Sequence, residues 1–114
     1  MTPATFFRTL GVMFTAATIA AAPGLSARAD EPAATIHIQN SAFTPAKITV
    51  AAGTTVTWIN DDEDLPHNIA AAGNAFESKL LGTGQTYSFT FAKPGTYEYF
   101  CTIHPYMRGK VIVK

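Results

Sequence analysis

The run QTYSFTF, at residues 85–91, shows the pattern that decides the fold. Its aromatic residues, Tyr87, Phe89 and Phe91, alternate with hydroxyl residues. Because successive side chains of a β-strand point to opposite faces, this run predicts a strand that is buried on one face only. The run TTVTWI, at residues 54–59, repeats the pattern one strand earlier, with Val56 and Trp58 on the apolar face.

Similar short runs recur on both sides, and none of them has the period of an amphipathic helix. Glycine and proline punctuate them at residues 52–53, 82–84 and 93–95, as expected of turns. The chain therefore predicts an all-β Greek-key sandwich of about seven to eight strands. Besides the two strands above, those expected are Thr35–Gln39, Lys47–Ala51, His67–Ala71, Thr96–Cys101 and Lys110–Lys114, with residues 72–81 left unassigned.

The N-terminal 29 residues have the composition of a cleavable signal peptide. The apolar run Leu10–Ala22 follows the positive charge of Arg8, and its 13 residues are fewer than the ~20 that span a bilayer. Small residues in Ala27-Arg28-Ala29 indicate cleavage before Asp30, although an uncleaved anchor is the alternative. We therefore expect export to the periplasm with no membrane anchor after cleavage. The predicted organisation is a signal peptide at residues 1–29, a short N-terminal segment at 30–34 and a single domain at 35–114.

Composition excludes several classes of protein. The 114 residues hold eight Lys and Arg against eight Asp and Glu, so no basic excess favours binding to nucleic acid. With 47% hydrophobic residues the chain is too apolar to be disordered. Its single cysteine, Cys101, excludes an intramolecular disulfide, a CxxC redox motif and a multi-cysteine zinc site.

Side chains that bind metals concentrate in one short segment, CTIHPYM, at residues 101–107. It offers a thiolate, an imidazole and a thioether at a three-residue spacing, from Cys101, His104 and Met107. Because the segment lies between two predicted strands, we expect a hairpin loop whose side chains converge on one point. His67, preceded by a proline, offers a second imidazole. Two histidines, one cysteine and a weak axial methionine form the ligand set of a blue-copper site.

Each of these residues has an ordinary structural interpretation when taken alone. A lone cysteine is usually a small buried hydrophobe, a lone methionine fills the core, and a lone histidine is polar surface. Their joint occurrence at regular spacing favours a metal site, and the thioether of Met107 favours copper over zinc. His37 alternates out of the apolar face of its predicted strand, so we assign it to solvent.

The segment at residues 95–113, together with VTWIN at 56–60 and PHN at 66–68, resembles the cupredoxins, the type 1 blue copper proteins of the plastocyanin and azurin kind. The short Cys-x2-His-x2-Met loop is similar to that of the amicyanins. The resemblance implies one type 1 copper ion, Cu(I) or Cu(II), whose ligands are His67, Cys101, His104 and Met107.

The resemblance also implies roles for the neighbours of the ligands. Asn68 would tie the two ligand loops together through its side chain and offer its backbone N–H to the Cys101 sulfur. The edge of His104 would reach the surface through an apolar patch that includes Pro66 and Pro105, where electrons enter or leave.

The expected function is a periplasmic shuttle of single electrons, with a copper carrier or storage protein as the alternative. The partners implied are transient redox proteins: a donor dehydrogenase or cytochrome, and an acceptor cytochrome c or oxidase. We expect a monomer, because a shuttle needs its patch free for successive partners. An enzyme is not expected, because Cys101 is flanked by Phe100 and Thr102 and not by a histidine that could connect it to a second copper.

An acidic run, Asp61-Asp62-Glu63-Asp64, lies between the Trp58 strand and His67. One interpretation is a solvated turn that charge keeps soluble. The other is an acidic docking surface that steers a basic redox partner. The sequence leaves both open.

Overall fold

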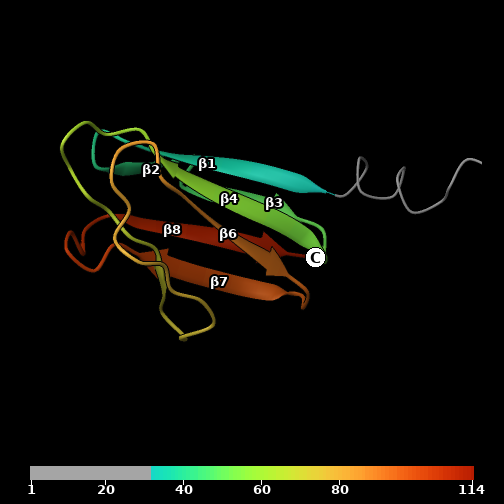
Figure 1. The fold of residues 1–114 in the computed structure, drawn as a ribbon. Helices are drawn as coiled ribbons and strands as arrows, with labels where there is room; N and C mark the ends of the chain where they lie inside the picture. The colour runs from blue at the N-terminus through green and yellow to red at the C-terminus, as the bar shows by residue number, and fades with distance from the viewer. Residues whose placement is uncertain (1–31) are drawn as a thin grey trace, which may run out of the picture.

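The computed structural model describes residues 32–114, which form two four-stranded sheets packed as a sandwich (Figure 1). One sheet has the strand order β2-β1-β4-β6 and the other β3-β8-β7-β5. The bounds are β1 Ala33–Gln39, β2 Ala42–Thr44, β3 Lys47–Val50, β4 Thr54–Asn60, β5 Ala70–Ala71, β6 Thr86–Phe91, β7 Gly95–Phe100 and β8 Arg108–Val113. The predicted β-sandwich is confirmed.

Both sheets are mixed. β1 runs parallel to β4 and β3 parallel to β8, while the other neighbours are antiparallel. The alternation recognised in the sequence sets the register: Trp58 in β4 lies opposite Tyr87 in β6, and Val56 lies opposite Phe89. These cross-strand pairs place the apolar side chains of both strands on the inner face of their sheet.

Most predicted strand bounds differ from the observed ones by one or two residues, one predicted strand is much shorter, and one strand was missed. The strand expected at His67–Ala71 is shortened to β5, because Pro66 has no N–H to donate and His67 forms an isolated bridge to Leu81 instead. β1 starts at Ala33, two residues before the expected Thr35. β2 was missed because three residues are too few for a period to appear. The predicted signal peptide lies outside the described residues, and within residues 32–114 no helix is long and apolar enough to cross a membrane.

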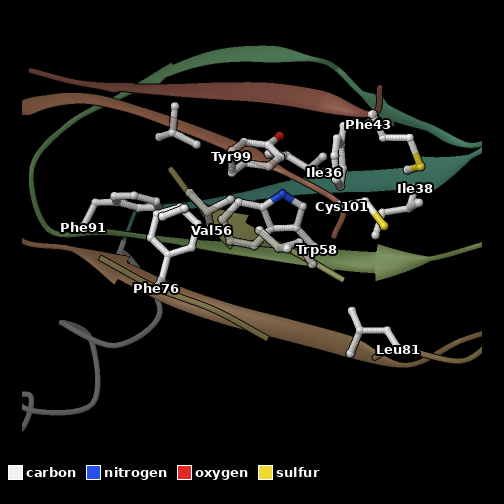
Figure 2. Close-up of a cluster of buried hydrophobic side chains, with 14 of the residues drawn as sticks. Ile36, Ile38, Phe43, Val56, Trp58, Phe76, Leu81, Phe91, Tyr99 and Cys101 are labelled. Atoms are coloured by element: carbon white, nitrogen blue, oxygen red, sulfur yellow. The ribbon is translucent and has the colours of Figure 1, made fainter. Parts of the chain in front are cut away.

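Trp58 lies at the centre of the core (Figure 2). Its ring centroid is 5.4 Å from that of Tyr99, 5.8 Å from that of Phe76 and 6.5 Å from that of Phe91. Phe76 comes from the stretch that the sequence left unassigned. Cys101 lies at one end of this aromatic cluster, so the core borders directly on the predicted metal site.

Tyr99 is buried with its hydroxyl, and within residues 32–114 that hydroxyl has no hydrogen-bond partner. Burial raises the pKa of Tyr99 to about 12, because the ionised phenolate is poorly solvated there. Its ring lies against Gly109, the residue opposite it in β8, where an added Cβ would be 2.2 Å from the Tyr99 Cζ atom. The absence of a side chain at Gly109 therefore lets the ring reach this position.

Candidate metal centre

The loop between β7 and β8 is closed by its own backbone. Cys101 follows β7 directly and Met107 precedes β8. The Cys101 N–H donates to the Met107 carbonyl at 3.1 Å, and the Met107 N–H donates to the His104 carbonyl at 2.9 Å. These two bonds fold the predicted hairpin loop into a compact turn that holds the three residues at one end of the sandwich (Figure 1).

His67 reaches the same end from the loop between β4 and β5. Its backbone is paired on both sides with Leu81, at N···O distances of 3.1 Å and 2.7 Å. Asn60, the last residue of β4, frames this loop, because its side-chain amide donates to the carbonyls of Leu65 and Leu81, each at 2.8 Å. His67 is therefore fixed by backbone contacts although it lies outside a strand.

Three donor atoms converge. The Cys101 sulfur lies 3.9 Å from Nδ1 of His67 and 3.8 Å from Nδ1 of His104, and donor atoms of all three residues lie within 4.8 Å of one another. Bonds of about 2.0–2.3 Å from a metal to nitrogen and sulfur bring two ligands of one ion to roughly this separation. The residues therefore fit a single ion, and their soft and borderline donors fit copper.

The four predicted ligands differ in their exposure to solvent. His67, Cys101 and Met107 are buried, whereas His104 is only half-buried. Apolar residues of the two loops that carry His67 and His104 are exposed: Leu65, Pro66, Ile103, Pro105 and Tyr106. His104 is thus the one predicted ligand that combines contact with the cluster and access to solvent.

Asn68 bridges the two loops. Its Oδ1 accepts hydrogen bonds from the Thr102 N–H at 2.8 Å and from the Thr102 hydroxyl at 3.1 Å. Since Thr102 is next to Cys101 and Asn68 is next to His67, these bonds restrain the separation of two predicted ligands. The expected contact between the Asn68 N–H and the Cys101 sulfur stays a prediction.

The acidic run is divided by the fold, which neither sequence interpretation anticipated. Glu63 and Asp64 are exposed, and Asp61 lies 2.5 Å from Nδ1 of the exposed His37. Asp62 is buried instead, and it is the functional candidate that the sequence analysis missed. Asp62 is charged and its sequence neighbours are charged, both of which suggest a solvated residue. Nothing in the local sequence therefore distinguished Asp62 from the exposed acidic residues around it.

The Asp62 carboxylate is fully engaged. It accepts from the backbone N–H of Asn40 at 2.6 Å, from that of Ser41 at 2.9 Å and from Nε2 of His67 at 2.8 Å. Burial alone would raise the pKa of Asp62, but the bonds from Ser41, His67 and Asn40 outweigh it and hold the pKa below its ordinary value. The carboxylate is therefore ionised beside the His67 ring at neutral pH.

Comparison with known proteins gives consistent matches. Residues 7–113 match the family model of the cupredoxin-like domain. Amicyanin of Paracoccus denitrificans is 40% identical over 114 residues, covering 95% of this chain and 86% of that protein. A methionine variant of amicyanin, solved with Cu(I), has a TM-score of 0.67 at 38% identity, covering 72% of this chain and 82% of that one.

A copper-containing nitrite reductase from Thermus scotoductus also shares the fold, with a TM-score of 0.67 at 35% identity. The match covers 73% of this chain but only 22% of the reductase. The likeness to the reductase is therefore confined to one part of a much longer enzyme, whereas the likeness to amicyanin extends over most of both chains.

Proposed function

The chain belongs to the cupredoxin family, whose cofactor is one type 1 copper ion, and from this premise we propose that it transfers single electrons between redox proteins. The proposed ligands are His67, Cys101, His104 and Met107. The observation on which the proposal rests is the convergence of one thiol and two imidazoles within 4.8 Å at the end of a rigid sandwich. Bound there, copper supplies a one-electron couple between Cu(I) and Cu(II).

The residues around the donors keep them in place. Backbone bonds close the 101–107 turn, and the Asn68–Thr102 bonds tie this turn to the loop that carries His67. A donor set that is positioned in advance moves little when the charge of its ion changes. This is what fast electron transfer requires, and it favours a shuttle over a protein that must open to release its ion.

The surface around His104 supports transient docking. Tyr106, whose ring centroid is 6.0 Å from that of His104, is 71% accessible. Leu65, in the loop that carries His67, is 44% accessible, so a partner can bury apolar surface at the end of the sandwich where the His104 imidazole is half-buried. Exposed Glu63 and Asp64 lie in the loop before Leu65 and would steer a basic partner. We propose a donor dehydrogenase or cytochrome and an acceptor cytochrome c or oxidase, met in turn by a monomer.

Two alternatives are less well supported. A copper carrier would use the same ligands, but three of them are buried and leave little room for an incoming acceptor ligand. An enzyme of the nitrite reductase kind needs a second copper centre, and Phe100 and Thr102 flank Cys101 where a histidine would make that connection. The periplasm is the proposed location, on the strength of the signal-peptide composition of residues 1–29.

The experiment that separates shuttle from carrier measures electron exchange and copper retention in the same sample. Reduced and oxidised protein are mixed, the exchange rate is followed by NMR line broadening, and a Cu(I) chelator is present through many redox cycles. We expect exchange with no loss of copper. Rapid transfer of copper to the chelator together with slow exchange would favour the carrier.

A matched pair of variants tests the docking surface. Leu65→Asp adds a charge at an exposed position in the loop that carries His67, and Ala92→Asp adds the same charge at an exposed position in the turn between β6 and β7, at the opposite end of the sandwich (Figure 1). Like charges that meet in a complex cost several kcal/mol, so Leu65→Asp should slow exchange by more than about tenfold. Equal rates in the two variants would argue against docking at His104.

A further inference from the structure

Asp62 links a proposed copper ligand to the sheet on the other side of the sandwich. The ligand loop 101–107 connects β7 and β8, in one sheet, whereas Asn40 and Ser41 form the turn between β1 and β2, in the other. The Asp62 carboxylate accepts from the backbone of that turn and from His67 Nε2. The orientation of the His67 ring therefore depends on the β2-β1-β4-β6 sheet, through the turn between β1 and β2, and not only on the sheet that carries the 101–107 loop.

Hydrogen bonds also fix the backbone of Asp62. The Asp62 N–H donates to the side-chain oxygen of Asn60 at 3.0 Å, and the Thr83 hydroxyl donates to the Asp62 carbonyl at 2.6 Å. Asn40 and Ser41 both have a φ of 54°, a left-handed conformation that aims two successive N–H groups into one anion site. Asp62 is therefore fixed by four residues before it contacts the histidine.

This arrangement selects one tautomer of His67. An ionised carboxylate can only accept hydrogen bonds, so the proton of the neutral imidazole must lie on Nε2. Nδ1 is then left with a free lone pair, and it is Nδ1 that lies 3.9 Å from the Cys101 sulfur, within the donor cluster. Asp62 is the acceptor that faces Nε2, so its hydrogen bond assigns the proton to that nitrogen of the ring.

We propose that Asp62 is a positioning residue for the copper centre, one that fixes the ring orientation and tautomer of His67 and makes its Nδ1 a stronger donor. The inference rests on the proposed function, because it presumes that His67 is a ligand. A carboxylate that accepts from a metal-bound imidazole increases the basicity of the ligand. A more basic ligand stabilises Cu(II) more than Cu(I), so Asp62 lowers the reduction potential of the centre.

The test compares Asp62→Asn with Asp61→Asn in the full chain. Both variants remove one negative charge from the same loop, but Asp61 contacts the exposed His37 and not a proposed ligand. We expect Asp62→Asn to weaken Cu(II) binding by about 10–100-fold and Cu(I) binding by less. A tenfold loss confined to Cu(II) raises the potential by ~59 mV, and Asp61→Asn should produce only a small change.

Two results would overturn the inference. Equal potentials in the two variants, or equal losses of Cu(I) and Cu(II) affinity in Asp62→Asn, would leave Asp62 with a structural role alone. The second test needs only the wild-type chain, in case Asp62→Asn fails to fold. Nitrogen NMR of the metal-free protein should find the neutral His67 ring protonated at Nε2, and protonation at Nδ1 would refute the proposal.

Failure of this inference is distinguishable from failure of the proposed function. If wild-type protein forms a blue copper centre but the variants behave alike, the function stands and the role of Asp62 falls. If the wild-type protein forms no such centre although His67 has the expected tautomer, the hydrogen bond stands and the proposed function falls.

Discussion

Alkaline pH should destabilise this fold through one buried side chain, Tyr99. Its pKa is about 12 in the folded protein, against an ordinary value of 10. Between these values the unfolded chain loses the phenol proton and the folded chain keeps it, so the contribution is fully present below pH 10 and is lost as the pH rises to 12. At ~1.36 kcal/mol per pKa unit, the two-unit difference corresponds to a loss of about 3 kcal/mol.

The assay compares wild type with Tyr99→Phe. The free energy of unfolding of the metal-free chain is measured with urea from pH 8 to pH 12. All other titratable groups are the same in both proteins, so the difference between their unfolding free energies isolates Tyr99. At pH 8 the variant should be at least as stable as wild type, because it removes a buried hydroxyl without a hydrogen-bond partner.

The expected result is a difference that grows in favour of Tyr99→Phe by about 3 kcal/mol between pH 10 and pH 12. Parallel stability curves over this range would mean that folding leaves the pKa of Tyr99 unchanged, which would contradict the prediction.

The remaining predictions concern the loops and the metal. Asn68→Ala removes the acceptor of two hydrogen bonds from Thr102, so it should cost about 1–2 kcal/mol of unfolding free energy and weaken Cu(II) binding ~10–100-fold in a competition titration; unchanged affinity would contradict the bridging role. Gly109→Ala places a Cβ 2.2 Å from the Tyr99 ring and should cost about 1–3 kcal/mol by urea denaturation, with a smaller cost in a Tyr99→Leu background; equal costs in the two backgrounds would exclude this contact as the cause. If free copper is at 100 times its Kd, removing it with a chelator should lower the unfolding free energy by about 2.7 kcal/mol. A melting temperature that does not change with copper concentration would rule out a copper site that exists only in the folded chain.

The sequence was sufficient for features that are encoded locally. The strands β4 and β6 were predicted because their alternation extends over six or seven residues, which few other structures produce. The grouping of Cys101 and His104 followed from their spacing in a short turn between strands. His67, 34 residues before Cys101, was predicted to join them from residue chemistry and family resemblance, and the structure brings its Nδ1 to 3.9 Å from the cysteine sulfur.

Features that depend on distant contacts were not predictable. Phe76 packs against Trp58 although its own stretch has no periodicity, because the sheet pairing around it determines where the loop must lie. Asp62 is the clearest case. The partners of its carboxylate include backbone N–H groups 21 and 22 residues away, and backbone donors leave no trace in the residue pattern. An aspartate in an acidic run therefore suggested a surface residue although it is buried.

Electron transfer by this protein requires that Cys101 binds copper beside two histidines. The most direct measurement adds one equivalent of Cu(II) to the protein lacking residues 1–29 and records visible absorption and electron paramagnetic resonance spectra, with Cys101→Ala as the control. We predict an intense thiolate-to-copper charge-transfer band with narrow copper hyperfine splitting in the wild type, and neither feature in the variant. A pale spectrum with wide splitting that Cys101→Ala leaves unchanged would show that Cys101 is not a copper ligand.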